Sequence, residues 1–411
     1  MKVLHTADWH LGKRLDAFSR LEEQREVLSE ICEIAEREAV DVVLVAGDLF
    51  DSFSPSAEAT ELLYSTLHRL SANGARAVVA IAGNHDSPER IEVPDALARA
   101  CGIIFVGFPN TQITPFSTQA GVKVTQTDKG FVELSLPQSP FPLRLILTPY
   151  ANELRLKTFL GIEETEGNLR QHLQDHWQAL ADQYFDEKGV NMLVSHLFMM
   201  KNGTEPPEEP EEEKPILHVG GASAVFSENI PAQTQYVALG HLHRFQYIDR
   251  QPCPVVYSSS PLAYSFSEAD QTKYVVLIQA QPNQPVDIQS IALTKGKRLL
   301  RKKFDNVADA LVWLTEHPEA IVQLTLVTET YLESADKKRL MEAHPYLMPI
   351  IPEIRSKKEE TSESPLLDLE NKSMEELFTD YFRNSKEGKG QLPSESILNL
   401  FREVLALDEE E

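Results

Sequence analysis

Short apolar runs that end at polar side chains recur between residues 2 and 245. Five segments share this pattern, and each has the length and apolar content of a buried strand. They are KVLHTADWH (2–10), DVVLVAGDLFD (41–51), AVVAIAGNHD (77–86), NMLVSH (191–196) and YVALGHLHRF (236–245). In the last segment His241 and His243 are two residues apart, so on a strand their side chains point to the same side.

Segments with helical spacing of apolar residues lie between these strands. RLEEQREVLSEICEIAEREAV (20–40) and SAEATELLYSTLHRLSANG (56–74) are amphipathic, and Asn73-Gly74 marks the end of the second helix. Strands that alternate with such helices are typical of a layered α/β domain. We place this domain at residues 1–280.

The remainder of the chain predicts three smaller parts. QPVDIQSIALTKGKRLLRKKF (284–304) reads as two strands around a Lys-Gly turn, and a helix, a strand and another helix follow, so we expect a small α+β domain over residues 281–354. Residues 355–372 are polar and without period, as in a linker, and residues 373–411 predict two amphipathic helices. A tethered helix pair buries little surface by itself, so it either binds a partner or packs back on the main body.

Composition and charge limit the function classes. The chain has 411 residues, 42% of them hydrophobic, and a net charge of −24, so contact with nucleic acid must be local. Its three cysteines are far apart, which argues against a disulfide framework and a thiolate metal site. No apolar run approaches the roughly 20 residues of a membrane span, and the amino terminus enters a strand at once, so we expect a cytoplasmic protein without membrane contact.

The polar strand ends carry the candidate chemistry. A single His-x-His is often just a solvated pair, but five such endings in a protein with 12 histidines favour one common site. Asp, Asn and His without Cys suit Mn, Fe or Zn at a catalytic centre. Two cations about 3.5–4 Å apart, bridged by one carboxylate, lower the pKa of a water and stabilise both oxygens of an in-line phosphoryl displacement. His5 lies in the opposite strand register from Asp8, so we expect a core histidine there.

The order of the motifs resembles a known family. D-x-H, G-D-x-x-D, G-N-H-D, S-H and G-H-x-H follow one another as in the calcineurin-like metallophosphoesterases. The resemblance implies an α/β fold, a layered β-sandwich flanked by helices. It also implies that one ion is held by Asp8, His10 and His243, the other by Asn84, His196 and His241, and that Asp48 bridges them. His85 would face the scissile phosphate as an acid or charge stabiliser, and Asp51 stands where some relatives have another histidine.

A narrower resemblance covers nearly the whole chain. TADWHLGKRL, VAGDLFDSFSPS, GNHDSPERI, HVGGASAVFSENI and YSSSPLAYSFSEAD are similar to the bacterial nuclease subunits of an ATP-dependent DNA-processing complex. This implies two Mn²⁺, with Mg²⁺, Fe²⁺ or Zn²⁺ as substitutes, 3′-to-5′ exonuclease activity on double-stranded DNA and ATP-dependent opening of hairpins, in DNA repair, recombination and replication. The chain has no G-x-x-x-x-G-K-[ST] motif, so the ATPase must be a separate subunit.

The same resemblance implies the partners. The helices at 373–411 would bind the ATPase subunit, and helices between Pro55 and Cys101 would form a homodimer, giving a heterotetramer with the ATPase. The domain at 281–354 would cap the active site and help to shape the entry of DNA.

A dense cationic cluster, KGKRLLRKK (295–303), begins this second domain. We expect it to contact DNA phosphates through Lys295, Lys297, Arg298, Arg301, Lys302 and Lys303. The alternative is that these cations protect an exposed sheet edge.

Two other functions compete with the nuclease. One is a phosphomonoesterase of the same two-metal fold, either a protein phosphatase or a nucleotidase, and the extra domain and tether argue against it. The other is a catalytically silent scaffold, against which the full ligand set argues.

Overall fold

The fold was analysed in a computed structural model of the 411-residue chain. It describes residues 1–16, 18–150, 167–204, 225–328 and 332–354, and single positions between 377 and 401. The chain divides into two units, Met1–Ile354 and Arg355–Glu411. The linker predicted at 355–372 lies outside the described residues, as do most positions of the helix pair predicted at 373–411.

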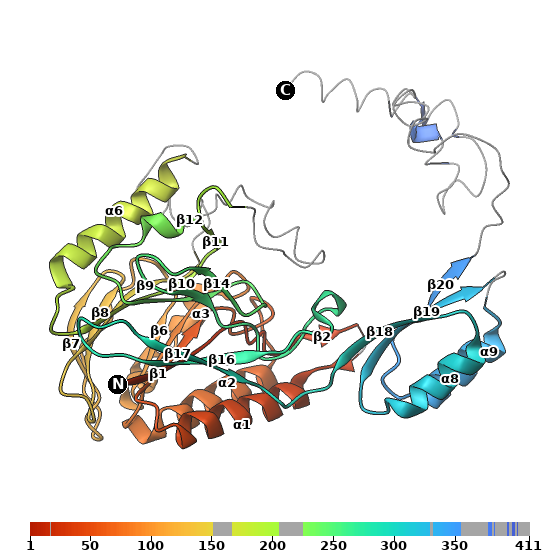
Figure 1. Ribbon diagram of the computed structural model, residues 1–411, viewed down its shortest axis with the longest axis horizontal. Coiled ribbons are helices and arrows are strands. Elements are labelled where there is room, and N and C mark those ends of the chain that lie inside the picture. Colours follow the sequence, from red (N-terminus) through yellow and green to blue (C-terminus); the bar gives the residue numbers. More distant parts are fainter. Residues whose placement is uncertain are drawn as a thin grey trace. The chain divides into compact units, whose positions relative to one another are not determined.

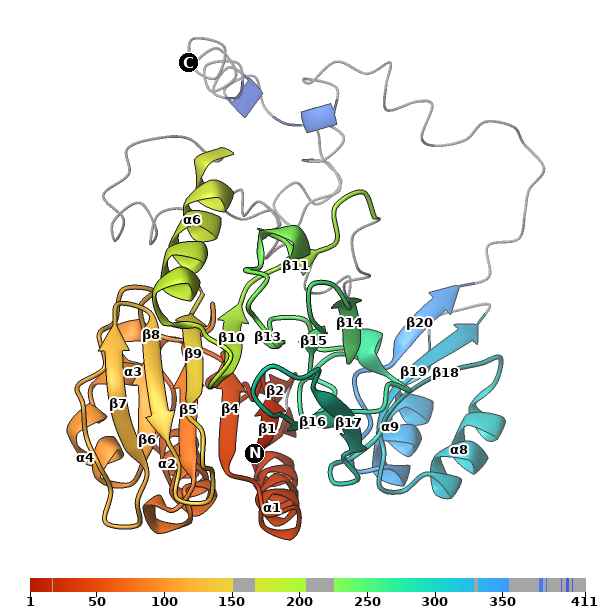
Figure 2. The same ribbon diagram turned by 60° about the vertical axis from the view of Figure 1, so that its left-hand side comes forward.

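Two sheets form the centre of the first unit. The first has six strands, in the order β17 (Asp287–Ala292), β16 (Tyr274–Gln279), β1 (Lys2–Thr6), β4 (Val42–Ala46), β5 (Ala77–Ile81) and β6 (Ile103–Val106). The second has seven, in the order β14 (Gln246–Asp249), β15 (Val255–Tyr257), β13 (Tyr236–Gly240), β10 (Val190–His196), β9 (Leu143–Thr148), β8 (Phe131–Ser135) and β7 (Lys123–Asp128). All five predicted strands are confirmed. Strands β1, β4, β5 and β6 are parallel, as are β9, β10, β13 and β15, and Figure 2 shows both sets side by side.

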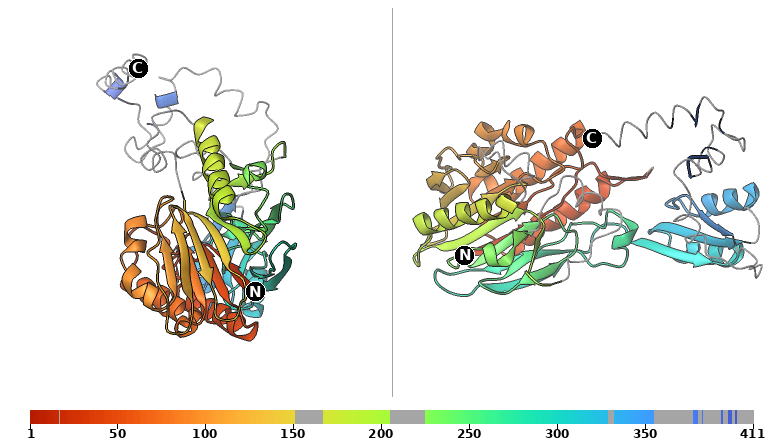
Figure 3. Two further views of the ribbon diagram at one scale, coloured as in Figure 1. Left: turned by 90° about the vertical axis from the view of Figure 1, so that its left-hand side faces the viewer. Right: turned by 90° about the horizontal axis from the view of Figure 1, so that it is seen from above.

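The sheets pack face to face, and helices cover their outer faces (Figure 1; Figure 3, left). Along β4, Val42 and Leu44 point into the core between the sheets, whereas Val43 and Val45 contact the outer helices. Because both faces are covered, the strand is apolar at every position rather than at alternate ones. This accounts for the continuous apolar runs of the sequence.

The helices that cover the first sheet are α1 (Leu21–Arg37) and α2 (Ala57–Leu70), and α6 (Gly167–Tyr184) covers the second. Ser56 caps α2 by accepting a hydrogen bond from the Ala59 amide over 3.2 Å. The predicted end of this helix is confirmed, because Asn73 and Gly74 after it both have positive φ. Shorter elements are α3 (Pro88–Glu92), α4 (Asp95–Ala100), η1 (Ala72–Gly74), η2 (Ser227–Asn229), η3 (Phe266–Glu268) and the strand pairs β2 (Arg14–Leu15) with β3 (Phe18–Ser19) and β11 (Met199–Met200) with β12 (Val225–Phe226).

A separate three-stranded parallel sheet follows, in the order β18 (Leu299–Phe304), β19 (Ile321–Thr328) and β20 (Ile351–Ile354), with α8 (Val307–Glu316) and α9 (Ser334–Ala343). It has its own apolar core. The predicted order of strand, helix, strand and helix is found in β18, α8, β19 and α9, whereas β20 was not predicted. Strand β17 lies on the far side of the predicted border at residue 280, yet it pairs with β16 of the six-stranded sheet. The small sheet therefore starts at Leu299.

His5 is a satisfied core histidine, as its register predicts. It is fully buried, and its ring nitrogens lie 3.0 Å from the Tyr236 hydroxyl and 3.1 Å from the Leu239 carbonyl.

The described positions of the second unit are few. Leu377, Phe378 and Phe401 are helical, and the rings of Phe378 and Phe401 stack 4.0 Å apart. Nowhere in the described ranges is a helix both long and apolar enough to cross a membrane.

Candidate metal centre

The carboxyl ends of five strands bring the predicted ligands together. Asp8 and His10 follow β1, Asp48 follows β4, Asn84 and His85 follow β5, His196 ends β10, and His241 and His243 follow β13. The Asp8 amide donates to the Gly47 carbonyl over 3.0 Å, and the Asp8 carboxylate accepts from the His241 amide over 2.9 Å. These bonds join loops from both sheets, so the site depends on the sandwich as a whole.

One group of potential ligands contains Asp8, His10 and His243. One ligand atom from each lies within 4.8 Å of the others, and all three residues are buried. His10 Nε2 and His243 Nε2 lie 3.0 Å apart. The resemblance assigned these three residues to one ion.

The second group contains the other four predicted ligands. Asn84 Oδ1 lies 2.9 Å from His196 Nε2 and 3.1 Å from His241 Nδ1. Asp48 Oδ2 lies 3.3 Å from His196 Nε2 and 3.5 Å from His10 Nε2. The Asp48 carboxylate therefore lies between the two groups, which is the position of a bridging ligand.

The donor set fits divalent cations. His196 Nδ1 donates to the Ala46 carbonyl over 2.8 Å, so Nε2 is the nitrogen that faces the oxygens of Asn84 and Asp48 and is available for an ion once it loses its proton. Converging oxygens and nitrogens of this kind repel one another unless a proton or a cation lies among them. Asp8 Oδ2 and His10 Nδ1 are also buried polar atoms without a hydrogen-bond partner, and such atoms are typical of functional sites.

Burial and charge together perturb the titration of these groups. Burial raises the pKa of Asp8 to about 6, and Asp48 adds to this effect while His196 opposes it. Burial would also raise the pKa of Asp48, but the imidazoles of His196 and His10 outweigh it and hold that pKa well below its usual range. Burial alone would lower the pKa of His196, yet Asp48 raises it to about 9. Two carboxylates buried side by side repel each other, so the site favours positive charge.

Four of the potential ligands have strained backbone conformations. Asp8, His10, Asp48 and His241 have φ values of 55°, 45°, 50° and 108°, in a region that non-glycine residues rarely adopt. Strain of this kind costs about 1–3 kcal/mol per residue and clusters at functional sites. The surrounding sheets hold these side chains in directions that regular strands do not give.

Three glycines in the motifs leave room for the ligands. A Cβ on Gly83 would lie 2.1 Å from Asp48 Oδ1, one on Gly47 would lie 2.2 Å from His196 Nδ1, and one on Gly240 would lie 1.9 Å from the Ala46 carbonyl oxygen. The motifs G-D, G-N-H-D and G-H-x-H therefore need glycine for close approach. Asp86 braces the loop, because its carboxylate accepts hydrogen bonds from the amides of Leu49, Phe50 and Gly83.

His85 lies at the partly exposed side of the site. Its amide donates to Asp48 Oδ1 over 2.8 Å, and its Nδ1 lies 3.0 Å from the Asp51 carbonyl oxygen. Nδ1 therefore carries the hydrogen in this contact, and Nε2 is left for a substrate. The Asp51 carboxylate itself pairs with Lys13 over 2.9 Å.

A second layer of residues supports the ligands, and sequence reasoning did not assign it. Gln24 Nε2 donates to the His10 carbonyl over 2.7 Å, and Glu268 Oε1 lies 3.3 Å from His243 Nδ1. Burial would raise the pKa of Glu268, but Lys273 and then His243 outweigh it and hold that pKa well below its usual range. The segment YSSSPLAYSFSEAD contains Glu268, but no sequence pattern connects this residue with His243.

The cationic cluster begins in the segment before β18, with Lys295, Lys297 and Arg298, and ends on β18, an edge strand of the small sheet, with Arg301, Lys302 and Lys303. Several of its members have partners: Lys297 with Glu319, Arg298 with Asp270, Arg301 with Gln323 and Lys303 with Glu353. Within the described part of the chain, the side chains of Lys295 and Lys302 have no carboxylate partner, although the Lys295 backbone amide donates to Glu30. The edge position and the partners agree with the alternative role of edge protection, and contact with DNA stays a prediction.

Comparisons with known proteins agree with the site. Residues 1–245 match the family described as calcineurin-like phosphoesterase. The chain is 34% identical to the SbcD subunit of the SbcCD nuclease of Bacillus subtilis, over 100% of this chain and 99% of that protein. It is 33% identical to the SbcD subunit of the same nuclease in Rhodobacter capsulatus, over 68% of this chain and 66% of that protein.

Among solved structures, a dimetal phosphatase from Danio rerio matches 72% of this chain and 99% of its own with 13% identity and a TM-score of 0.39. The family match and the full-length relative carry the assignment. The chain belongs to the calcineurin-like phosphoesterases and, within them, to the SbcD family of nuclease subunits, and it is a hydrolase acting on phosphodiester bonds.

Proposed function

We propose that this chain is the nuclease subunit of an SbcCD complex, with 3′-to-5′ exonuclease activity on double-stranded DNA and, together with the SbcC ATPase, endonuclease activity that opens DNA hairpins. One observation carries the proposal: seven potential ligands from two sheets converge, with Asp48 between His10 and His196. Metal-dependent phosphodiester cleavage needs such a donor set.

The residue roles are proposed as follows. One ion would be held by Asp8, His10 and His243, the other by Asn84, His196 and His241, and Asp48 would serve both. Two bound Mn²⁺ ions would supply the Lewis acidity that activates water and stabilises charge on the phosphate. His85, as an imidazolium with its Nδ1–H on the Asp51 carbonyl, gives the Nε2 proton to the departing sugar oxygen as the bond between that oxygen and phosphorus breaks, and its charge stabilises the phosphate.

A substrate panel tests the activity. We expect the full chain with Mn²⁺ to degrade a short DNA duplex from its 3′ ends and to lose this activity in EDTA. His85→Gln should lower the cleavage rate by at least about 100-fold while the protein still binds two Mn²⁺ per chain by calorimetry. Efficient turnover of p-nitrophenyl phosphate without turnover of DNA would instead identify a phosphomonoesterase.

We propose that residues 281–354 cap the active site and that Lys295 and Lys302 contact DNA phosphates. In the described ranges the side chains of the other four members each have a carboxylate or amide partner, and these two do not. Exchange of both for Gln should reduce the salt dependence of DNA binding by up to about two units of the log–log slope. An unchanged slope would leave them the role of edge protection.

The helical segment at 373–411 is proposed to bind SbcC. A chain that ends at residue 365 should keep its Mn²⁺-dependent nuclease activity and lose co-purification with SbcC. Retained association would refute the assignment.

A homodimer is proposed through α3 and α4, giving a heterotetramer with SbcC. Val93 and Leu97, four positions apart in this segment, are 81% and 79% exposed, which is unusual for large apolar side chains. Val93→Glu together with Leu97→Glu should convert a dimer to a monomer in sedimentation experiments. An unchanged sedimentation coefficient would place the dimer interface elsewhere.

A further inference from the structure

Glu268 is a buried carboxylate behind the metal centre. It ends η3 and is 1% exposed. Its Oε1 lies 3.3 Å from His243 Nδ1 and accepts a hydrogen bond from the Tyr264 amide over 3.1 Å. A carboxylate at this depth is costly unless its charge is matched.

The contact with His243 is on the side of the ring that faces away from the ligands. His243 Nε2 faces His10 Nε2 at 3.0 Å, so Nε2 is the nitrogen available for an ion and Nδ1 is the outer nitrogen. A carboxylate at Nδ1 keeps the hydrogen there, which leaves the lone pair on Nε2 and raises its basicity.

Lys273 holds Glu268 in place. Its ammonium group pairs with Glu268 Oε2, and it also donates to Ser260 Oγ over 3.0 Å and to the His243 carbonyl over 2.8 Å. All three donors of this 6% exposed lysine are thus in use, two of them on Glu268 and on the backbone of His243 itself. Buried ion pairs are weak sources of stability, because desolvation offsets their attraction. The contacts of Glu268 and Lys273 with His243 instead fix the orientation of the His243 imidazole.

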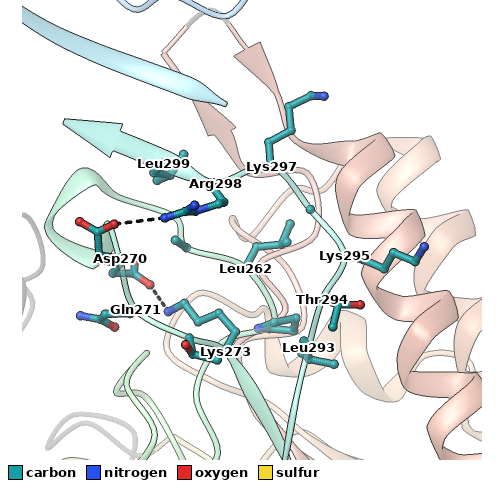
Figure 4. A pocket seen from close by; sticks show the side chains of 15 residues that line it. Leu262, Asp270, Gln271, Lys273, Leu293, Thr294, Lys295, Lys297, Arg298 and Leu299 are labelled. Carbon is teal, nitrogen blue, oxygen red and sulfur yellow. Dashed lines mark hydrogen bonds and ion pairs between the residues drawn. The ribbon is translucent and has the colours of Figure 1, made fainter. Parts of the chain in front are cut away.

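Asp270, two residues after Glu268 in the same loop, is exposed and pairs with a different residue. Asp270 pairs with Arg298 over 3.7 Å, and both side chains are about three-quarters exposed, at 75% and 76%. Figure 4 shows Asp270, Arg298 and Lys273 around a cavity of about 360 Å³, whose far wall is the segment Leu293–Leu299 that leads into β18. The loop therefore offers two carboxylates two residues apart, one on a proposed ligand and one remote from it.

We propose that Glu268 is a positioning residue for the ion that His243 helps to hold. It fixes the tautomer and ring orientation of His243, and Lys273 fixes Glu268. The inference rests on the proposed function in that His243 is taken as a ligand.

Calorimetric titration of the metal-free full chain with Mn²⁺ tests the proposal. Glu268→Gln keeps the shape of the side chain and removes its charge, so we expect one of the two sites to weaken by about 10–100-fold and the other to stay unchanged. Asp270→Asn, the matched control in the same loop, should bind both ions as the wild type does. If Glu268→Gln also binds both with wild-type affinity, the proposal is overturned.

A second variant separates positioning from folding. Glu268→Gln leaves Lys273 without its counter-charge, and this could unfold the loop. The double variant Glu268→Gln with Lys273→Met removes that unpaired charge, and we expect the weak Mn²⁺ site to persist in it. Recovery of wild-type affinity in the double variant would show that Glu268 only neutralises Lys273. A wild type that binds no Mn²⁺ at all would refute the proposed function itself, a result distinct from both.

Discussion

A methyl group added at Gly83 should disable the metal centre without unfolding the protein. A Cβ on Gly83 would lie 2.1 Å from Asp48 Oδ1 and 2.2 Å from the Asp48 amide nitrogen, whereas ordinary contact begins at 3.4 Å. The carboxylate would have to move by 3.4 − 2.1 = 1.3 Å. Because the backbone nitrogen is also too close, rotation of the Asp48 side chain cannot relieve the overlap.

The size of the effect follows from this displacement. Metal–ligand distances tolerate only about 0.2 Å, and a misplacement of about 1 Å can lower an enzymatic rate about 100-fold. Forced overpacking usually costs about 1–3 kcal/mol, less than the roughly 5–15 kcal/mol that stabilises a folded domain. Gly83→Ala should therefore fold, bind less than two Mn²⁺ per chain and cleave DNA at least about 100-fold more slowly.

The assay compares bound metal, cleavage rate and thermal unfolding in the same preparations. Gly203→Ala is the control for destabilisation without a clash: nothing lies within 4 Å of the added methyl there, but the φ of +76° strains the alanine backbone, so it should lower the thermal stability and leave bound metal and cleavage rate unchanged. A Gly83→Ala protein with wild-type metal content and rate would show that Asp48 is not held as the structure has it, and the bridging role would have to be abandoned.

Two other predictions concern charge and pH. Burial lowers the pKa of His5 to about 3, below its value of about 6.5 in the unfolded chain. Below pH 6.5 the unfolded chain therefore binds a proton that the folded protein does not. The free energy of unfolding is thus highest above pH 6.5 and falls as the pH drops toward 3. Between pH 7 and pH 5 His5 accounts for a loss of about 2 kcal/mol. Because burial also lowers the pKa of His10 and His241, urea unfolding in EDTA should show a loss in both proteins that is about 2 kcal/mol smaller in His5→Gln than in the wild type; equal losses would contradict the reasoning. At the mouth of the site, Asp51 pairs with Lys13, and a phosphomonoester carries one more negative charge than a diester. Asp51→Asn should therefore raise the ratio of p-nitrophenyl phosphate hydrolysis to bis(p-nitrophenyl) phosphate hydrolysis by up to about tenfold. Lys13→Met should lower the same ratio. If neither variant changes the ratio, the Asp51–Lys13 pair only positions His85.

The local pattern of the chain was sufficient for the strands and the potential ligands. A strand buried on both faces must be apolar throughout, so a polar residue at its end is conspicuous, and Asp8, Asp48, Asn84, His196 and His241 were found in this way. Their glycine neighbours carry a signal too, since the ligands approach so closely that a Cβ would overlap them.

Contacts between segments that are distant in the sequence could not be predicted from the local pattern. Glu268 reaches His243 across 25 positions, and Lys273 holds both, yet neither has a spacing that marks it. Strand β17 shows the same limit, because its sequence fits any sheet edge and only its pairing with β16 assigns it to the larger sheet.

The sequence by itself determined the strands, the identities of the potential ligands and the family to which they point. These depend on the order of apolar and polar residues along the chain, which the sequence contains directly. The tertiary structure alone decided which atoms face each other: Asp48 between His10 and His196, Glu268 behind His243, and carboxylate partners for Lys297, Arg298 and Lys303 of the cationic cluster. Charge interactions fall off over a few ångströms in space and not along the sequence, so only the folded arrangement fixes them.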